Sequence, residues 1–552
     1  MTDDRRLMLT IALCLAIYLG WSWMLMATKR KESLSQPATT TAQAITPAAP
    51  APERLAPSAR AAATPTRPEQ RVELESPELR LVFSTRGATL LHATLKNPQY
   101  RRRLEGKDVP VDLVRGEGGE GRALRVSFDG ASWPDDPLAD YDFKVEPGGR
   151  ALVFRRQEGK VVLTRRFALV SPYLLEMSVA VEGGAARQIT TEFGGTQPPG
   201  GGPAPSGIFG KLLRSYPNVA TALCRVDGKS ESSPSNKASS VTRSGTVQFG
   251  GLDERFFVAA LAPQGPRTGS CVLESSAAGL VAAKISLPIA AGAATSETLG
   301  LFLGPKDLDL LQRSSTLPGE KDNAELESSV GFGFWTALCV PMLRAMEFFR
   351  GWIPNWGVAI LLLTVVIKLV MYPLQQAQYR SMEKMKLLQP KVEELKKRLG
   401  DDKERLNVEM MKLYTENKVN PLGGCLPMIL QMPIWWALYR LLGTTIQLYR
   451  EPFIRGWIDD LTAPDHFYIL PLAMGVTMVV TQLLSPQMAD SGQQRLMMWM
   501  MPILFTVFFL NLPAGLTLYI FASNLLNIAQ QYLVRAKTRR AAPPGRVAAA
   551  GV

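Results

Sequence analysis

The apolar stretch from Trp356 to Pro373 constrains this chain most, because a segment of this length and composition is typical of a membrane-spanning helix. It nevertheless contains Lys368, a charged residue several positions from its end. Thr364 lies one helical turn before Lys368 and Gln375 two turns after it, so the three side chains share one helix face. Polar groups are costly in hydrocarbon, and we therefore expect this face to point into a wet or protein-lined space. The alternative is that Lys368 only snorkels to the membrane surface.

Four more apolar runs follow this first one and predict further spans. They are residues 428–448, residues 467–484 and two helices within 496–534, where the turn sequence 511–515 divides a run long enough for two spans. The sequence therefore predicts a five-span helical core over residues 355–535.

The N-terminal residues 1–31 contain another apolar run, Leu7 to Met26. It is longer than the core of a signal peptide and no clear cleavage site follows it, which indicates an uncleaved anchor and a sixth span. A cleaved signal peptide is the alternative. Residues 32–70 are rich in Ala, Thr and Pro and predict an extended linker.

A basic segment, residues 376–420, separates the first core span from the second. Apolar stripes at helical spacing lie on both sides of Gly400, and the acidic pair Asp401–Asp402 is favourable at a helix N-terminus, so the segment predicts a helical hairpin. The excess of Lys and Arg here and in the tail 536–552 places both in the cytoplasm. It also explains the net charge of +13 without DNA binding. Counting spans back from the tail puts the N-terminus inside and the middle of the chain outside.

Residues 71–315 change to short alternating strands separated by Gly, Pro and Asp, as in Leu79 to Phe83. This pattern is typical of an all-β sandwich or barrel. The following residues 316–354 read as a linker and an amphipathic helix that Pro341 interrupts. The helix fits the membrane interface, and a linking helix packed on the β domain is the alternative.

The five cysteines show no CxxC or other metal spacing, and we expect neither a metal nor a cofactor. Cys224 and Cys271 both fall in the β region, where an oxidising compartment would allow them to pair. The sequence leaves this open and favours unpaired thiols.

Several later span residues are polar. Gln431 opens the second core span, Thr477 lies in the third, and the last span carries Ser523, Asn524 and Asn527. Hydrogen bonding between helices is the simpler explanation, and a shared polar cavity is the functional one. The predicted spans contain no Asp or Glu, which argues against a proton-coupled pump and favours a passive cavity.

One motif, NPLGGCLP followed by QMPI, is specific. Together with Met371 to Leu374, Gly475 to Met478 and Leu518–Tyr519, it closely resembles YidC-type membrane protein insertases of the YidC/Oxa/Alb family, in the Gram-negative form with a large outer β domain. The motif residues expected to be structural are Asn420, Pro421, Gly423, Gly424, Pro427 and Pro433.

The resemblance implies a function without covalent catalysis, so we expect no enzyme. Such proteins insert and help to fold membrane proteins, alone or with the Sec translocon, through a positively charged groove open to cytoplasm and lipid. Lys368 matches the central basic position, where the family more often has Arg. The groove is expected to be lined by Lys368, Thr364, Gln375, Gln431, Thr477, Tyr519, Ser523, Asn524 and Asn527.

The resemblance also implies the location and the partners. The chain is expected in a bacterial inner membrane, with both termini cytoplasmic and a supersandwich-like β domain in the periplasm. Expected partners are nascent membrane proteins, the Sec translocon, membrane lipids and the ribosome, which would meet the basic hairpin and tail. The alternatives are a membrane-anchored sugar-binding or sugar-epimerising protein that uses the β domain, and a multi-span channel.

Overall fold

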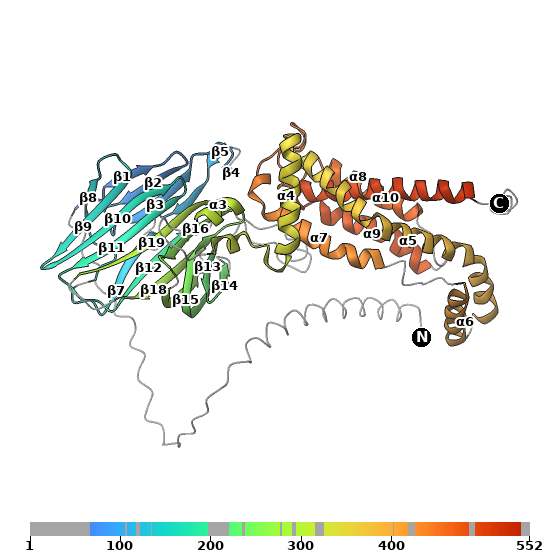
Figure 1. Cartoon of the computed structure of the whole chain (residues 1–552), viewed down its shortest axis with the longest axis horizontal. Coiled ribbons are helices and arrows are strands. Elements are labelled where there is room, and N and C mark those ends of the chain that lie inside the picture. The colour runs from blue at the N-terminus through green and yellow to red at the C-terminus, as the bar shows by residue number, and fades with distance from the viewer. Residues whose placement is uncertain are drawn as a thin grey trace, which may run out of the picture. The chain divides into compact units, whose positions relative to one another are not determined.

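The computed structural model describes residues 67–541 of the chain, except 105–106, 117–121, 134, 197–219, 235–237, 266, 277–278, 290–293, 315–324, 401, 418–425 and 485–491. The predicted anchor, nearly all of the linker and the end of the basic tail lie outside the described residues. The described chain comprises an antiparallel β domain and a helical core, which belong to one unit except for residues 492–497 at the start of helix α9 (Gly492–Phe509) (Figure 1).

The strands of the β domain alternate in many cases between buried and partly buried residues. They are β1 (Arg71–Glu75), β2 (Leu79–Ser84), β3 (Thr89–Leu95), β4 (Arg101–Leu104), β5 (Lys107–Pro110), β6 (Asp112–Arg115), β7 (Ala123–Asp129), β8 (Asp142–Val145), β9 (Ala151–Glu158), β10 (Val161–Ser171), β11 (Leu174–Glu182), β12 (Gln188–Thr196), β13 (Thr221–Val226), β14 (Lys229–Pro234), β15 (Ser239–Asp253), β16 (Phe257–Pro263), β17 (Arg267–Ser275), β18 (Leu280–Pro288) and β19 (Ala294–Pro305).

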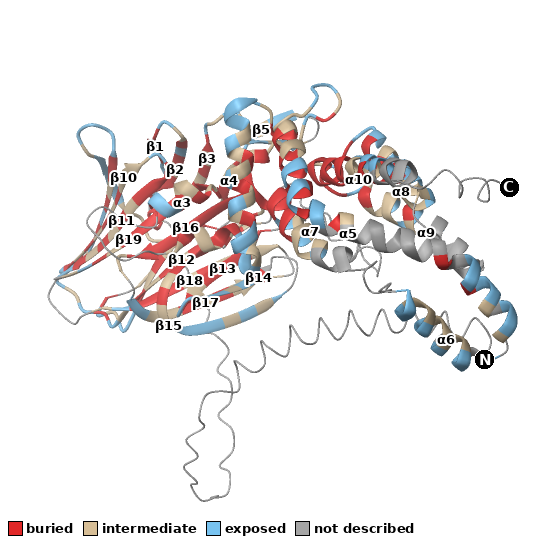
Figure 2. Cartoon of the chain, turned by 45° about the vertical axis from the view of Figure 1, so that its right-hand side comes forward, coloured by how far each residue is buried: buried red, intermediate tan, exposed pale blue. Residues whose placement is uncertain are grey.

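These strands form two runs that meet at the long strand β15. One run is β8-β9-β10-β11-β19-β16, and the other is β1-β2-β3-β7-β12-β18-β17. β15 pairs with β16 through Gly250 to Asp253 and with β17 through Ser239 to Val247. The ring of Phe83 on β2 packs against Phe154 and Phe167 of the other run, so the two runs face each other across a core. The predicted β sandwich is confirmed (Figure 2).

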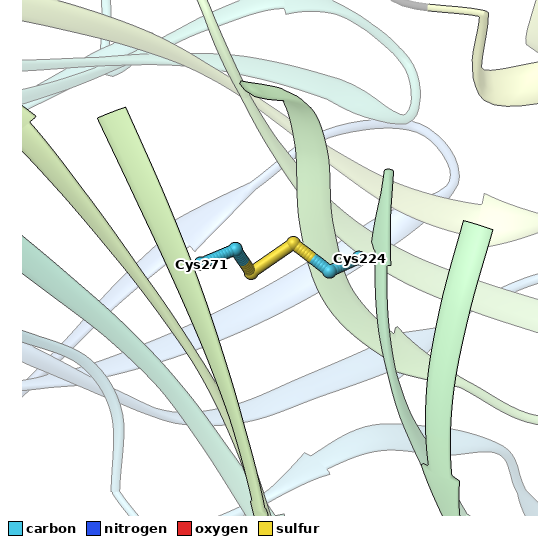
Figure 3. The surroundings of a disulfide bond; sticks show 2 residues. All are labelled: Cys224 and Cys271. Atoms are coloured by element: carbon cyan, nitrogen blue, oxygen red, sulfur yellow. A yellow bond between two sulfur atoms is a disulfide. The ribbon is translucent and has the colours of Figure 1, made fainter. Parts of the chain in front are cut away.

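Cys224 on β13 and Cys271 on β17 form a disulfide, with their Cα atoms 6.6 Å apart (Figure 3). The expectation of unpaired thiols was therefore wrong. Both strands pair with β15, whose Gly250 lies opposite Cys224. A Cβ atom at Gly250 would stand 3.3 Å from the Cys271 sulfur, so a glycine at this position leaves room for the bridge. A sequence separation of 47 residues did not reveal this proximity.

A short linker of helical turns leads out of the β domain. It comprises α3 (Leu308–Ser314), η2 (Leu326–Val330), η3 (Gly333–Trp335) and α4 (Thr336–Trp352). Pro341 lies inside α4 and does not interrupt it, contrary to expectation. α4 buries Cys339, Leu343 and Met346 on one stripe and packs on the core helices α5 and α7, while Trp352 remains 76% exposed.

The helical core begins directly after α4. Its elements are α5 (Trp356–Leu399), α6 (Lys403–Glu416), α7 (Leu426–Thr444), η5 (Ile446–Leu448), α8 (Ile469–Leu484), α9 (Gly492–Phe509) and α10 (Ala514–Ala541). By length and composition, one described helix segment, Trp356–Pro373, is long and apolar enough to cross a membrane, and two shorter apolar helices are Ile469–Leu484 and Met500–Phe509. The predicted break between the last two helices is present at residues 510–513.

The basic segment forms the predicted helical hairpin. Its first arm is the second half of α5, which continues without a break through Pro373 and Pro390. The side chain of Asp402 caps α6 by accepting a hydrogen bond from the backbone N–H of Arg405. The predicted stop at Gly400 and the start after Asp402 are both confirmed.

Candidate functional site

The polar residues of the core meet where α10 packs between α5 and α8. Lys368 on α5 is only 7% exposed, and its Nζ atom donates a hydrogen bond to Oδ1 of Asn527 on α10, 2.9 Å away. A lysine that snorkelled would hold its ammonium group in solvent. Lys368 therefore points into the protein, and snorkelling alone does not describe it.

A second polar contact continues the line from α10 to α8. Nδ2 of Asn524 lies 3.3 Å from Oγ1 of Thr477 and donates to it, and the same hydroxyl donates to the carbonyl oxygen of Met474. Asn524 and Asn527 are one helical turn apart, so one face of α10 contacts both neighbours. We call the three-helix arrangement of Lys368, Asn527, Asn524 and Thr477 the polar seam.

Tyr519 on α10 is fully buried. Its hydroxyl group faces Gln431 on α7 and Ser523 on α10, but it makes no hydrogen bond of normal geometry with any residue that the structure describes. Ser523 is buried as well, while Gln431 is half-buried. These three predicted residues lie together, beside the polar seam.

Thr364 does not require a polar cavity. It is completely buried, and its hydroxyl donates to the carbonyl oxygen of Ile360 one turn earlier, at 2.7 Å. A threonine bonded within its own helix is tolerated in an apolar environment. Its position one turn from Lys368 is as predicted, but it does not by itself show that the face is wet.

Four glutamines of the core helices give the strongest evidence for a polar environment. Each has a buried side-chain atom without a hydrogen-bond partner among the described residues: Gln375 Oε1, Gln482 Oε1, Gln530 Nε2 and Gln531 Oε1. Buried polar groups are nearly always paired with protein or with water. Gln375 was predicted, whereas Gln482, Gln530 and Gln531 were not among the predicted site residues. A helical count along α8 and α10 gives a signal for these three, because it places them at the depth of Lys368 or beyond.

The polar seam is closed at one end of the core. We call residues 445–468, which connect α7 to α8, the core loop, and the end of the core that they hold the loop end. The side-chain amide of Asn355 donates a hydrogen bond to the carbonyl oxygen of Phe453. The backbone N–H of Ala514 donates to the carbonyl oxygen of Ala463. Lys368 lies about 18 Å along α5 from this end. The space between is filled by the buried apolar residues Ala359, Ile360, Leu363, Leu470, Leu516 and Leu518.

The structural motif is described only in part. Asn420, Pro421, Gly423 and Gly424 lie outside the described residues. Pro427 and Pro433 lie in α7, and the helix continues through Pro433.

Comparison with known proteins covers both halves of the chain. The family model of the 60Kd inner membrane protein matches residues 348–541, and that of the YidC periplasmic domain matches residues 71–345. The membrane protein insertase YidC of Anaeromyxobacter dehalogenans is 36% identical over 502 residues, which are 86% of this chain and 87% of that protein.

Solved structures align more loosely. A structure described as an active YidC insertase with its first transmembrane domain resolved covers 84% of this chain and 93% of its own, at 16% identity and a TM-score of 0.37. A putative aldose 1-epimerase of Escherichia coli K12 aligns with 43% of this chain and 99% of its own, at 9% identity and a TM-score of 0.30.

Proposed function

Because this chain belongs to the YidC family of membrane protein insertases, an inner-membrane family with a periplasmic domain, we propose that it inserts substrates through the polar seam around Lys368. The seam acts as a groove that is open to the cytoplasm and to lipid, and it is closed towards the periplasm by the apolar residues at the loop end. The groove is lined by the predicted residues together with Gln482, Gln530 and Gln531.

The observation that carries this proposal is the bonding of Lys368. Its ammonium group is buried against the neutral amide of Asn527, and no ion pair of Lys368 occurs within the described part of the chain. A buried charge without a counter-charge is costly, because its field is poorly screened. The site therefore favours the arrival of a carboxylate, which an acidic outer segment of a nascent chain supplies.

The unpaired glutamines support a wet groove. Polar atoms that lack protein partners are satisfied by water when the site is reachable, and three of the four glutamines lie further from the loop end than Lys368. Water that enters from the cytoplasmic side shortens the apolar distance that a polar segment must cross. Apolar segments then move sideways into lipid, driven by burial.

The hairpin and the topology complete the proposal. The hairpin and the tail face the cytoplasm, both termini lie inside, and six spans cross the membrane. The hairpin receives ribosomes through its basic residues, and the Sec translocon shares part of the substrate load. α4 lies in the interface, where exposed aromatic residues such as Phe348 and Trp352 suit the headgroup region.

A reconstituted system tests the proposal directly. Proteoliposomes that contain only this protein should insert a small membrane protein with an acidic outer segment, measured by protection of that segment from protease. Empty liposomes and liposomes with heat-inactivated protein serve as controls. Insertion at the level of empty liposomes would contradict the proposal. Ion conductance without insertion would favour a channel, and sugar epimerisation by the purified chain would favour the sugar-active alternative.

A further inference from the structure

A cavity of ≈ 460 Å³ lies beyond the loop end, between the β domain and the core loop. Its lining includes five arginines: Arg101, Arg102 and Arg103 of β4, Arg255 before β16, and Arg450 of the core loop. Three aspartates of the core loop, Asp459, Asp460 and Asp465, also line it. Its lining is thus net cationic. We call this cavity the arginine cleft.

Three of the arginines hold the cleft together. Arg102 pairs with Glu254 at 2.7 Å, and Arg450 pairs with Asp108 at 2.9 Å. Arg255 donates to the carbonyl oxygens of Gly443 and Thr462, at 2.8 and 3.2 Å. The contacts of Arg450 and Arg255 join the β domain to the core loop and to the end of α7, whereas the Arg102–Glu254 pair lies within the β domain. The guanidinium groups of all three arginines are already engaged.

The remaining two arginines are differently placed. Arg101 and Arg103 are exposed on the rim, and their side chains make no ion pair with any residue that the structure describes. The carbonyl oxygen of Arg101 accepts a hydrogen bond from the Tyr449 hydroxyl at 2.7 Å, which fixes the backbone of β4 against the loop. The backbone that carries these two arginines is therefore fixed at the cleft, and their exposed guanidinium groups have hydrogen-bond donors available.

The carboxylates of the cleft are engaged with the protein itself. Asp465 accepts hydrogen bonds from Trp457 Nε1 and from the backbone N–H groups of Phe467 and Leu470. Asp460 accepts from the backbone N–H of Arg450 and from Thr462. Asp459 is exposed and accepts from the Gly456 N–H. An acidic peptide that extended through the cleft would run past these negative charges, whereas a single compact anion on the rim avoids them.

The position of the cleft points to the membrane surface. Its core-loop residues begin at Tyr449, five residues after α7 ends, and finish at His466, three residues before α8 begins. The lining also includes the aromatic rings of Tyr449 and Trp457, and such rings favour the headgroup layer, where one edge is apolar and the other wet. Guanidinium groups bind phosphate through paired hydrogen bonds.

We propose that the arginine cleft binds a phospholipid headgroup of the periplasmic leaflet, with its phosphate on Arg101 and Arg103 and its glycerol and upper acyl region against Tyr449 and Trp457. The bound lipid bridges the β domain and the core loop. This inference does not depend on how the groove inserts substrates.

The test is equilibrium binding to the delipidated full-length protein in detergent. The probe is short-chain phosphatidylglycerol. Its binding is compared with that of diacylglycerol of the same chain length, inorganic phosphate and an acidic peptide. We expect phosphatidylglycerol to bind more tightly than diacylglycerol, which lacks phosphate, and more tightly than free phosphate, which lacks apolar contacts. The double variant Arg101→Gln/Arg103→Gln should weaken lipid binding by roughly tenfold or more.

The matched control is Arg150→Gln/Arg155→Gln, which removes two exposed arginines elsewhere in the β domain and should bind lipid unchanged. An unchanged melting temperature of the first double variant shows that the fold is intact, as expected for side chains without ion pairs in the described structure. Equal lipid affinity of that variant and the native protein would overturn the proposal. So would equal binding of diacylglycerol or of free phosphate, or a preference for the acidic peptide.

Discussion

Lys368 on α5 and Asn527 on α10 are joined by a hydrogen bond of 2.9 Å, and this contact links a buried cation to a neutral amide. An acidic partner at the same place would neutralise the charge and leave nothing for a substrate carboxylate. The amide satisfies one ammonium proton and keeps the net charge of the site. The pair thus joins the two helices and leaves the positive charge of Lys368 without a counter-charge.

Replacing Asn527 by Asp tests this arrangement. Asn527→Asp supplies Lys368 with a counter-charge, so insertion of substrates with acidic outer segments should fall roughly tenfold, equivalent to about 1.4 kcal/mol. Substrates with neutral outer segments should insert normally. Asn527→Ser, which keeps a polar group without charge, is the control and should retain most of the activity. Undiminished insertion of acidic substrates by the Asp variant would show that the charge is not used.

The unpaired glutamines predict where water reaches. Single cysteines placed at Gln375, Gln482 and Gln531 in a cysteine-free protein should react with a membrane-impermeant maleimide added from the cytoplasmic side. Cysteines at Ile360 and Leu363, near the loop end, should not react, because apolar side chains fill that region. The readout is the labelled fraction after a fixed time in inverted vesicles. Equal labelling of both groups would mean that the seam is not closed at the loop end.

The topology is tested by labelling single cysteines with the impermeant maleimide from the periplasmic side. In intact spheroplasts, a cysteine at Arg150 should be labelled from outside, and one at Glu404 in the hairpin should be labelled only after the membrane is opened. The prediction follows from the basic hairpin and the periplasmic β domain. Labelling of position 404 in intact spheroplasts would exclude the six-span arrangement.

Arg165 on β10 predicts a strong stability effect inside the β domain. It is 1% exposed and donates to the carbonyl oxygens of Gly87 and Leu124, two residues with left-handed backbone. Burial lowers the pKa of Arg165 to about 10, so the side chain stays charged at neutral pH. Arg165→Met leaves both carbonyl groups without their donor and should cost about 2–4 kcal/mol in the free energy of unfolding.

Hydrogen exchange of the full-length protein measures this change in the free energy of unfolding. We expect the backbone amides of strands β2, β3 and β7 to lose protection first. Arg155→Met, an exposed arginine on the neighbouring strand β9, is the control and should change the free energy of unfolding by less than about 0.5 kcal/mol. Identical exchange in both variants would show that Arg165 does not hold the two carbonyl groups.

Local patterns in the sequence predicted the elements well. The charged face of α5, the stop at Gly400, the cap at Asp402 and the break at residues 510–513 all follow from spacing, capping and turn residues. These signals act over a few residues, so they can be recognised in the sequence without knowledge of the tertiary fold.

Contacts between distant segments were less predictable. Nothing local to Cys224 and Cys271 indicates that both strands pair with β15. Equally, the position of Thr364 suggested a wet face, yet its hydroxyl bonds to its own helix. Gln482 was missed because one glutamine near the end of a span is usual at a membrane surface, and only the packing of α8 on α10 shows that its oxygen is buried without a partner.

The charge of Lys368 is tested most directly by insertion of two matched substrates, one with an acidic and one with a neutral outer segment, at equal protein level. Lys368→Arg should insert both, because charge and reach are kept. Lys368→Glu should fail with the acidic substrate through repulsion in a poorly screened site, and the neutral substrate should suffer much less. Equal insertion of the acidic substrate by the Glu variant and the native protein would contradict a role for this charge in drawing substrates into the groove.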